Sequence, residues 1–375
     1  LMKQTYLFLI FVSMSLNISA QKRLRDYGVK IGVMKTGALN AITDVKGVKV
    51  GHTTIQQGDS VNTGVTAIIP AEGNLFQSKV PAAIYIGNGF GKLMGISQVK
   101  ELGNLETPIV LTNTLSIATA ADAIIDYSVS QKENQNLRSV NAIVGETNDS
   151  YLNDIVGRHV KKQHILTAIE NAKNGVVAEG NVGAGTGTVC FGFKGGIGTA
   201  SRVLPKASGG YTVGVLVQTN FGGVLQIDGV PVGVALNQYF LNNQLNDPAD
   251  GSCMIVVITD APVTTRNLER IAKRAMMGLA KTGGIASNGS GDYVIAISNA
   301  EGLRVPHESK EKLQTVQELR NDEVSPLFLA TIEATEEAIL NSLFAAKTLK
   351  GKNGTIQSLP IDQTIKLLKE YKKIN

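Results

Sequence analysis

The segment DPADGSCMIVVITDAPV, residues 247–263, places a turn directly before an apolar strand. Asp250 and Gly251 favour a tight turn, because glycine takes a positive φ freely and aspartate tolerates it. The five apolar residues 254–258 predict a short strand that is buried on both faces. Ser252 therefore stands at the first position of a buried strand, directly after a glycine. Turn chemistry alone can explain this serine, so the rest of the chain has to distinguish a structural from a chemical role.

Composition and charge narrow the class of protein. The chain has 375 residues, of which 43% are hydrophobic and 40 are glycine, a high share that predicts many tight turns in a folded body. Its formal charge is +5, with lysine and arginine scattered among aspartate and glutamate. The basic groups at 161–162 and 372–373 are short and carry no interleaved aromatic residues. A nucleic-acid surface would show a denser basic stripe, so nucleic acid is excluded as a partner.

The first twenty residues, LMKQTYLFLIFVSMSLNISA, differ from the rest of the chain. One positive charge at Lys3 precedes an apolar core at 6–11, and the small residues Ser19 and Ala20 end the segment. This pattern predicts a secretory signal peptide at 1–20, because the apolar core is too short for a membrane span. The alternative is an N-terminal helix of the fold. The mature chain is expected to be periplasmic or secreted, with no membrane partner after signal removal.

The mature chain is expected to form one α+β domain, residues 21–375, in which helices cover a glycine-rich sheet. No proline- or serine-rich linker divides it. The helix at 264–283 is the clearest, with apolar residues at helical spacing and a glycine at its end. Strands are predicted at 64–70, 82–89, 180–198, 211–223 and 292–298, a hairpin at 40–55, and further helices at 116–129, 153–175, 325–351 and 361–371.

Two glycine-rich stretches only resemble nucleotide-binding motifs. GNGFGK at 87–92 and GNVGAGTGT at 180–188 match neither the dinucleotide fingerprint nor the P-loop. The second runs on into an apolar segment that predicts a strand and not a helix. Close approach between backbones explains both stretches, and no cofactor is predicted.

The histidines and cysteines do not form a metal site in the sequence. His159 and His164 are five positions apart and do not share the helix face that a zinc motif requires. The four histidines are expected to be surface residues or to be satisfied by hydrogen bonds. Cys190 and Cys253, the two cysteines of the chain, cannot complete a zinc site alone and are expected to be buried thiols.

A serine hydrolase without an evident histidine needs another base. A cut between Gly251 and Ser252 would supply one, because the new α-amino group of Ser252 has an ordinary pKa of about 7.7–8.0. Glycine before the serine lets the hydroxyl approach the carbonyl carbon, and a strained turn can assist an N-to-O acyl shift.

Nine segments, in this order, resemble the DmpA/P1 family of self-processing N-terminal-serine aminopeptidases, which includes L-aminopeptidase/D-esterases and β-peptidyl aminopeptidases. The resemblance covers nearly the whole mature chain. It rests on NAITDVKGVKVGHTTI, VNTGVTAIIP, LETPIVLTNTLS, VGETNDSYLND, EGNVGAGTGT, KGGIGTASR, YTVGVLVQTNFG, DGSCMIVVITDAPV and GSGDYVIAIS.

The resemblance implies a four-layer α/β/β/α sandwich of the N-terminal-nucleophile-hydrolase type. It also implies autocleavage into an α chain, 21–251, and a β chain, 252–375, and a homo-oligomer for which relatives suggest a tetramer of processed units. The expected activity is that of an exported aminopeptidase or amidase acting on short peptides, amides or esters. An acyltransferase of the same fold and a non-enzymatic small-ligand-binding protein remain as alternatives.

By the same resemblance, four residues are expected to be catalytic. Ser252 matches the nucleophile, and Ser290 matches a second serine that hydrogen-bonds the nucleophile and its amine. Asn220 matches the asparagine that stabilises the oxyanion. Asp292 replaces a glutamate of some relatives, and its shorter side chain leaves its contact with the amine open.

A free substrate amine calls for an acidic group near the nucleophile, and Glu146 and Asp292 are the candidates. Gly291 is included with Glu146 in the predicted substrate-binding set. Asn148 is included as well, although some relatives carry an aromatic residue near this position and Tyr151 is the nearest aromatic here. The preference among L-, D- and β-amino acids depends on pocket shape, which motifs do not report.

Overall fold

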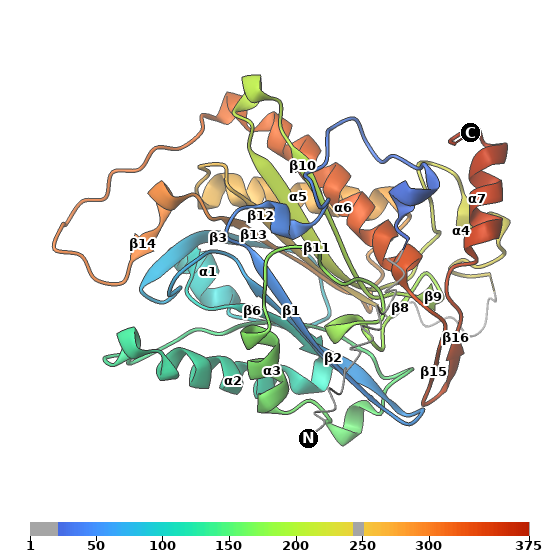
Figure 1. Ribbon diagram of the computed structural model, residues 1–375, viewed down its shortest axis with the longest axis horizontal. Coiled ribbons are helices and arrows are strands. Elements are labelled where there is room, and N and C mark those ends of the chain that lie inside the picture. Colours follow the sequence, from blue (N-terminus) through green and yellow to red (C-terminus); the bar gives the residue numbers. More distant parts are fainter. Residues whose placement is uncertain (1–21, 243–250, 375) are drawn as a thin grey trace, which may run out of the picture.

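Two stacked β-sheets form the centre of the structure, a computed structural model that describes residues 22–242 and 251–374 (Figure 1). The predicted signal peptide lies outside the described residues. The first sheet has the order β10-β11-β12-β13-β3-β14, with β5 paired to β3. Its strands are β3 (Ser78–Gly89), β5 (Asn104–Leu105), β10 (Ile197–Val203), β11 (Thr212–Asn220), β12 (Ser252–Thr259), β13 (Gly291–Ser298) and β14 (Val305–Pro306).

The second sheet has the order β1-β2-β6-β7-β4 and faces the first. One apolar core joins the two sheets and contains Ile68 and Ile109 from the second sheet and Leu216 and Val256 from the first. Its strands are β1 (Lys49–Gln57), β2 (Val61–Ile69), β4 (Leu93–Met94), β6 (Ile109–Asn113) and β7 (Ile143–Thr147).

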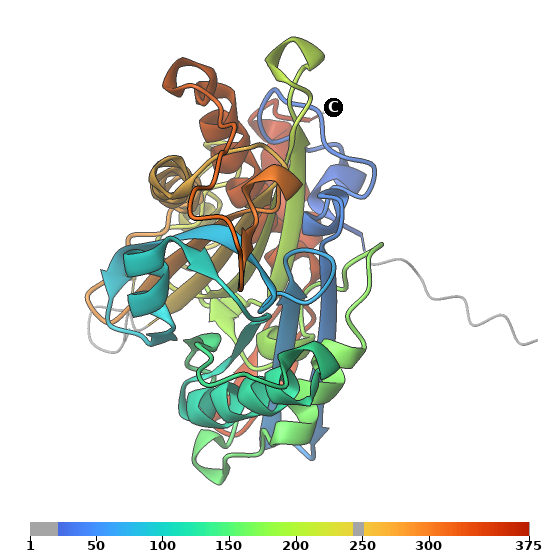
Figure 2. The same ribbon diagram turned by 90° about the vertical axis from the view of Figure 1, so that its left-hand side faces the viewer.

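Helices cover both outer faces, so the molecule has four layers (Figure 2). The long helices α5 and α6 bury apolar residues against β11–β13, and α2 and α3 do the same against the second sheet. These layers confirm the predicted α/β/β/α sandwich. The helices are α1 (Ile96–Leu102), α2 (Ile117–Ser130), α3 (Lys162–Glu170), α4 (Val232–Ala235), α5 (Thr265–Lys281), α6 (Ser325–Ala345) and α7 (Ile361–Glu370). None of the helices within the described ranges is long and apolar enough to cross a membrane.

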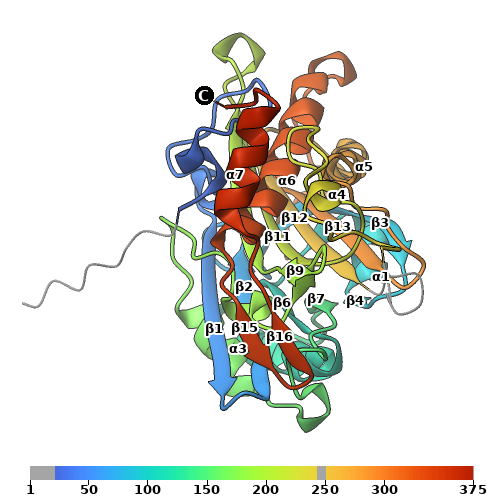
Figure 3. The same ribbon diagram turned by 90° about the vertical axis from the view of Figure 1, so that its right-hand side faces the viewer.

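The C-terminal segment closes one side of the molecule. Figure 3 shows α7 above the hairpin of β15 (Leu349–Gly351) and β16 (Gly354–Ile356), which runs beside β2. The chain then returns to its start, since a Cβ placed on Gly28 would lie 3.8 Å from Cγ2 of Ile374. The first and last parts of the described chain are therefore neighbours.

Several predicted elements differ from the structure. The hairpin expected at 40–55 is instead formed by β1 and β2, because residues 42–44 make a 3₁₀ turn. Helix α6 ends at Ala345 and not at Gly351, which belongs to a hairpin. The helix expected at 153–175 is reduced to α3, and the segment 180–198 contains only the short strands β8 (Val189–Cys190) and β9 (Phe193–Lys194) before β10 begins.

Candidate active site

Three strand ends of the first sheet meet at one point. Ser252 begins β12 and pairs with Asn220, the last residue of β11, and with Gly291, the first residue of β13. Because β11 is antiparallel to β12 and β12 is parallel to β13, the end of β11 lies beside the starts of the other two strands. Residues that are far apart in the sequence are thus held together by backbone pairing in the middle of a sheet.

The Gly251–Ser252 peptide bond is buried at this point. The Ser252 hydroxyl donates a 2.6 Å hydrogen bond to the Gly251 carbonyl oxygen, and the Gly291 N–H donates to the same oxygen at 3.1 Å. A Cβ on residue 251 would lie 2.5 Å from Cα of Phe221, so only glycine fits there. The carbonyl before the serine therefore lies between a hydroxyl and a backbone N–H.

Asn220 is oriented by the short strand β8. Its Oδ1 accepts a hydrogen bond from the N–H of Val189 at 2.9 Å, and the residue is only 6% exposed. With its oxygen engaged in this way, the Nδ2 group remains as the donor. This arrangement suits the expected role of Asn220 as a donor to a developing oxyanion beside Ser252.

Ser290 and Asp292 flank Gly291 and interact with each other. The Ser290 hydroxyl donates to Oδ1 of Asp292 at 2.9 Å, and both residues are buried. Burial raises the pKa of Asp292 to about 6, against the opposing effect of the bond from Ser290. In this uncut chain Ser290 thus donates to Asp292, and the other Asp292 oxygen, Oδ2, is buried without a partner among the described residues.

Glu146 approaches the same point from the second sheet. It lies in β7 directly after Gly145, and a Cβ on Gly145 would lie 2.8 Å from the sulfur of Met254 in β12. Oε1 of Glu146 accepts the Lys92 N–H at 2.9 Å, and Oε2 accepts the Thr114 hydroxyl. Burial raises the pKa of this carboxyl group.

A loop that crosses from one sheet to the other connects these parts. Gly91 lies between β3 of the first sheet and β4 of the second, and its carbonyl accepts the Tyr293 hydroxyl at 2.7 Å. A Cβ on Gly291 would lie 2.5 Å from Cα of Gly91 and 3.3 Å from Oγ of Ser252. Sequence reasoning missed the contribution of Gly91 and Lys92 to the site, although the GNGFGK stretch signalled a close approach of backbones.

Asn148 is placed differently from the other predicted site residues. It follows the end of β7, is exposed, and accepts the Ser150 N–H at 2.9 Å through its Oδ1. This bond makes Asn148 a turn residue in the structure. Its role in substrate binding stays a prediction.

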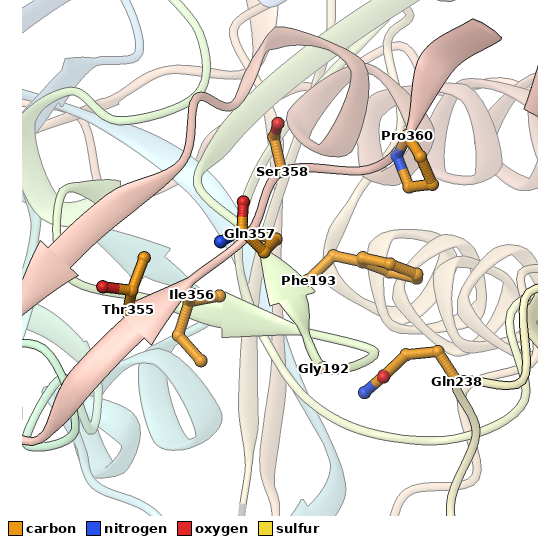
Figure 4. Close-up of a pocket in the computed structure, with 8 residues that line it drawn as sticks. All are labelled: Gly192, Phe193, Gln238, Thr355, Ile356, Gln357, Ser358 and Pro360. Atoms are coloured by element: carbon orange, nitrogen blue, oxygen red, sulfur yellow. The ribbon is translucent and has the colours of Figure 1, made fainter. Parts of the chain in front are cut away.

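A cavity of about 620 Å³ lies elsewhere, between the β8–β9 hairpin and the C-terminal segment (Figure 4). Among the described residues that form its walls, none has a charged side chain and none is a predicted catalytic residue. We therefore assign the chemistry to the strand ends at Ser252 and not to this cavity. The cavity is lined by Gly192, Phe193, Gln238, Thr355, Ile356, Gln357, Ser358 and Pro360.

The cysteines and histidines complete the comparison with the sequence. Cys190 and Cys253 are free and buried, which confirms the prediction. His52 is an exception to the expectation of surface or satisfied histidines, because its Nε2 is buried without a partner among the described residues. Its Nδ1 lies 2.9 Å from the Thr66 hydroxyl, and burial lowers its pKa to about 4.

The four layers and the buried serine at a strand start define the class of N-terminal-nucleophile hydrolases. A structure described as a variant of that fold, the L-aminopeptidase D-Ala-esterase/amidase of Ochrobactrum anthropi, matches with a TM-score of 0.86 and 33% identity, over 94% of this chain and 99% of that one. The PH0078 protein of Pyrococcus horikoshii OT3 matches with a TM-score of 0.87 and 47% identity, also over 94% and 99%.

Comparison with sequence relatives identifies the family to which this chain belongs. The beta-peptidyl aminopeptidase BapA of Sphingosinicella microcystinivorans is 42% identical over 374 residues, which cover 94% of this chain and 93% of the relative. The family model of peptidase family S58 matches residues 40–357. The chain belongs to peptidase family S58, and it is a serine aminopeptidase with the N-terminal-nucleophile-hydrolase fold. This membership excludes a purely ligand-binding role.

Proposed function

We propose that the chain is an exported aminopeptidase that activates itself by cutting its Gly251–Ser252 bond and then releases N-terminal residues, β-amino acids among them, from short peptides, amides or esters. One observation carries the proposal. The Ser252 hydroxyl lies 2.6 Å from the oxygen of the carbonyl that precedes it, and the Gly291 N–H donates to that oxygen.

Self-cutting requires an acyl shift from nitrogen to oxygen. The Ser252 Oγ attacks the Gly251 carbonyl carbon, the C–N bond breaks, and the Ser252 nitrogen takes the hydroxyl proton and becomes a free amine. Water then hydrolyses the ester and leaves a carboxyl group on Gly251. The Gly291 N–H donates to the oxygen on which negative charge develops in the first step.

Substrate turnover uses the same atoms a second time. The free α-amine of Ser252 accepts the hydroxyl proton while Oγ attacks the substrate carbonyl, and the Nδ2 group of Asn220 donates to the oxyanion. Glu146 provides a buried carboxylate for the substrate's ammonium group, because it reaches this point from the facing sheet.

The substrate class and the location follow from separate arguments. The beta-peptidyl aminopeptidase named above supports β-amino acid residues as substrates. The signal-like segment 1–20 supports export to the periplasm or beyond. A homo-oligomer, with a tetramer as its expected form, stays part of the proposal through the resemblance to the family.

The proposal is tested with wild type, Ser252→Ala and the control Ser309→Ala, which changes an exposed serine of a surface loop. Wild type and the control should yield two chains, the second beginning at Ser252, and should cleave aminoacyl and β-aminoacyl p-nitroanilides. Ser252→Ala should remain one chain and be inactive. An active, uncut wild type would refute self-activation, whereas transfer of the acyl group to added amines in preference to water would favour the acyltransferase alternative.

A further inference from the structure

Lys92 places a positive charge beside the buried carboxylate of the site. Its Nζ lies 4.0 Å from Oε1 of Glu146, the same oxygen that accepts the Lys92 N–H. The Lys92 side chain is 59% exposed, whereas that of Glu146 is 2% exposed. The ammonium group therefore lies on the solvent side of the carboxylate.

The backbone that carries Lys92 is held close to the nucleophile. The loop that carries it passes over Gly291, since a Cβ on Gly291 would lie 2.5 Å from Cα of Gly91 and 3.3 Å from Oγ of Ser252. The bond from the Tyr293 hydroxyl to the Gly91 carbonyl holds the loop down, and Asn88 Nδ2 donates to the Ser287 carbonyl at 2.7 Å. A Cβ on Gly91 would lie 3.1 Å from Cα of Gly291 and 3.2 Å from Oε1 of Glu146. The loop thus carries the pair of opposite charges, Lys92 and Glu146, close to the strand end that holds the nucleophile.

Such a pair is suited to a substrate residue that carries the opposite two charges on one carbon. In a β-amino acid residue the amine is separated from the scissile carbonyl by one additional carbon, and any substituent on the amine-bearing carbon lies next to the ammonium group. If that substituent is a carboxylate, Glu146 can bind the ammonium and Lys92 the carboxylate. Aspartate linked through its side chain is this residue.

We propose that the enzyme accepts β-aspartyl residues, also called isoaspartyl residues, and that Lys92 selects them by binding their free α-carboxylate. This inference rests on the proposed β-aminopeptidase function and specifies its substrate class. Hydrolysis breaks the bond between the β-carbonyl carbon and the leaving amine, which departs with a proton. Water then releases the residue from Ser252 as free aspartate.

The experiment compares two fluorogenic substrates that differ only at the relevant carbon. β-Aspartyl-7-amido-4-methylcoumarin carries a carboxylate there, and 3-aminobutyryl-7-amido-4-methylcoumarin carries a methyl group. The measured quantity is the ratio of kcat/KM for the first substrate to that for the second. The processed enzyme is assayed as wild type, Lys92→Met and Lys92→Arg, with Lys100→Met as the control at an exposed lysine of α1.

Wild type should cleave both substrates. Lys92→Met should lower the ratio by about 10-fold or more, the scale of one charge-assisted hydrogen bond, while Lys92→Arg and Lys100→Met should keep it within about 3-fold. An unchanged ratio in Lys92→Met would overturn the proposal, because Lys92 would then act only through Glu146. Wild type that cleaves only the aminobutyryl substrate would overturn it as well, with the β-aminopeptidase function intact. Failure on both substrates would refute that function and the inference together.

Discussion

At the scale of single residues, a variant of Asn220 tests whether its amide group stabilises the oxyanion. Asn220→Ala removes the Nδ2 donor beside Ser252 and also the oxygen that accepts the Val189 N–H. We expect kcat to fall by about 10²–10³, the usual effect of one oxyanion donor, with the pH dependence unchanged. Steady-state kinetics on an aminoacyl anilide provides the measurement. A loss of less than threefold would mean that Asn220 does not contact the oxyanion.

Asp292 should control the acidic limb of the pH profile. Its carboxyl has a pKa raised to about 6, so it is ionised at the pH where an α-amine loses its proton. A nearby carboxylate favours the ammonium form and therefore raises the pKa of the Ser252 amine. Asp292→Asn should shift the acidic limb of kcat/KM toward lower pH by about one unit, measured on a neutral ester. An unmoved limb would show that this carboxylate does not interact with the base.

The sequence identified the site residues only as separate motifs. It predicted Ser252, Ser290 and Asn220 through the family resemblance, and the pairing of β11, β12 and β13 then brings them together. The contact between Lys92 and Glu146 could not be predicted, because it depends on a loop that crosses between two sheets. A motif specifies which residue types occur together in the sequence, whereas the contact between Lys92 and Glu146 depends on how the two sheets stack.

At the scale of elements, the crossing loop depends on two glycines that face each other. Gly291→Ala would place a Cβ 2.5 Å from Cα of Gly91, too close for any contact without a shift of the backbone. We expect this variant to lose self-cutting and most of its activity while it remains folded. Gly302→Ala is the control, since no atom of the described residues lies within 4 Å of the added carbon. The fraction of cut chain, read on a denaturing gel, and circular dichroism decide the outcome.

The hairpin of β1 and β2 should respond to acid through His52. Its pKa is about 4 in the folded protein and about 6.5 in an unfolded chain, so the unfolded chain takes up a proton first as the pH falls. His52 therefore makes the protein less stable between pH 6.5 and 4. His52→Asn should reduce this acid-induced loss of unfolding free energy by about 1–3 kcal/mol. Urea unfolding at several pH values measures the difference. A His52→Asn variant that follows the wild-type curve would contradict the prediction.

The sequence predicted those helices and strands that are determined by a local pattern of apolar and turn-forming residues. The strand at Ser252 and the helix α5 match their predictions, because apolar periodicity and turn residues mark both. The segment 42–44 differs because the carboxylate of Asp44 accepts backbone N–H groups and the Ser201 hydroxyl, and these contacts stabilise a turn. A distant partner such as Ser201 is invisible to a local pattern.

At the scale of the whole molecule, a buried ionic cluster joins the two predicted chains. Arg202 lies in β10 before the cut and bonds Glu333 at 2.9 Å and Glu337 at 2.7 Å in α6 after it. Arg25, near the start of the described residues, also binds Glu337 at 2.6 Å. Removing Glu337 takes one carboxylate partner from both arginines and leaves Arg202 with Glu333. Breaking a buried ion pair by removing one partner typically costs about 3–5 kcal/mol.

Glu337→Gln should therefore lower the free energy of unfolding and let the cut chains separate at lower urea concentration. Glu269→Gln is the control, because it breaks an exposed pair with Lys273 on one helix, a pair that contributes little. Gel filtration of the processed enzyme in increasing urea measures the separation. Equal midpoints for the two variants would show that the cluster does not hold the chains together.

The closeness of Gly28 to Ile374 means that the order of the chain could be changed without changing the fold. A circular permutant that begins with an initiator methionine followed by Ser252, and that joins the old ends by a short linker, would have the nucleophile as its first residue once that methionine is removed. We expect it to be active without a cut between Gly251 and Ser252, whereas the same permutant with Ser252→Ala should be inert. Self-cutting and a changed order of the gene would then be two ways to obtain the free α-amine of Ser252.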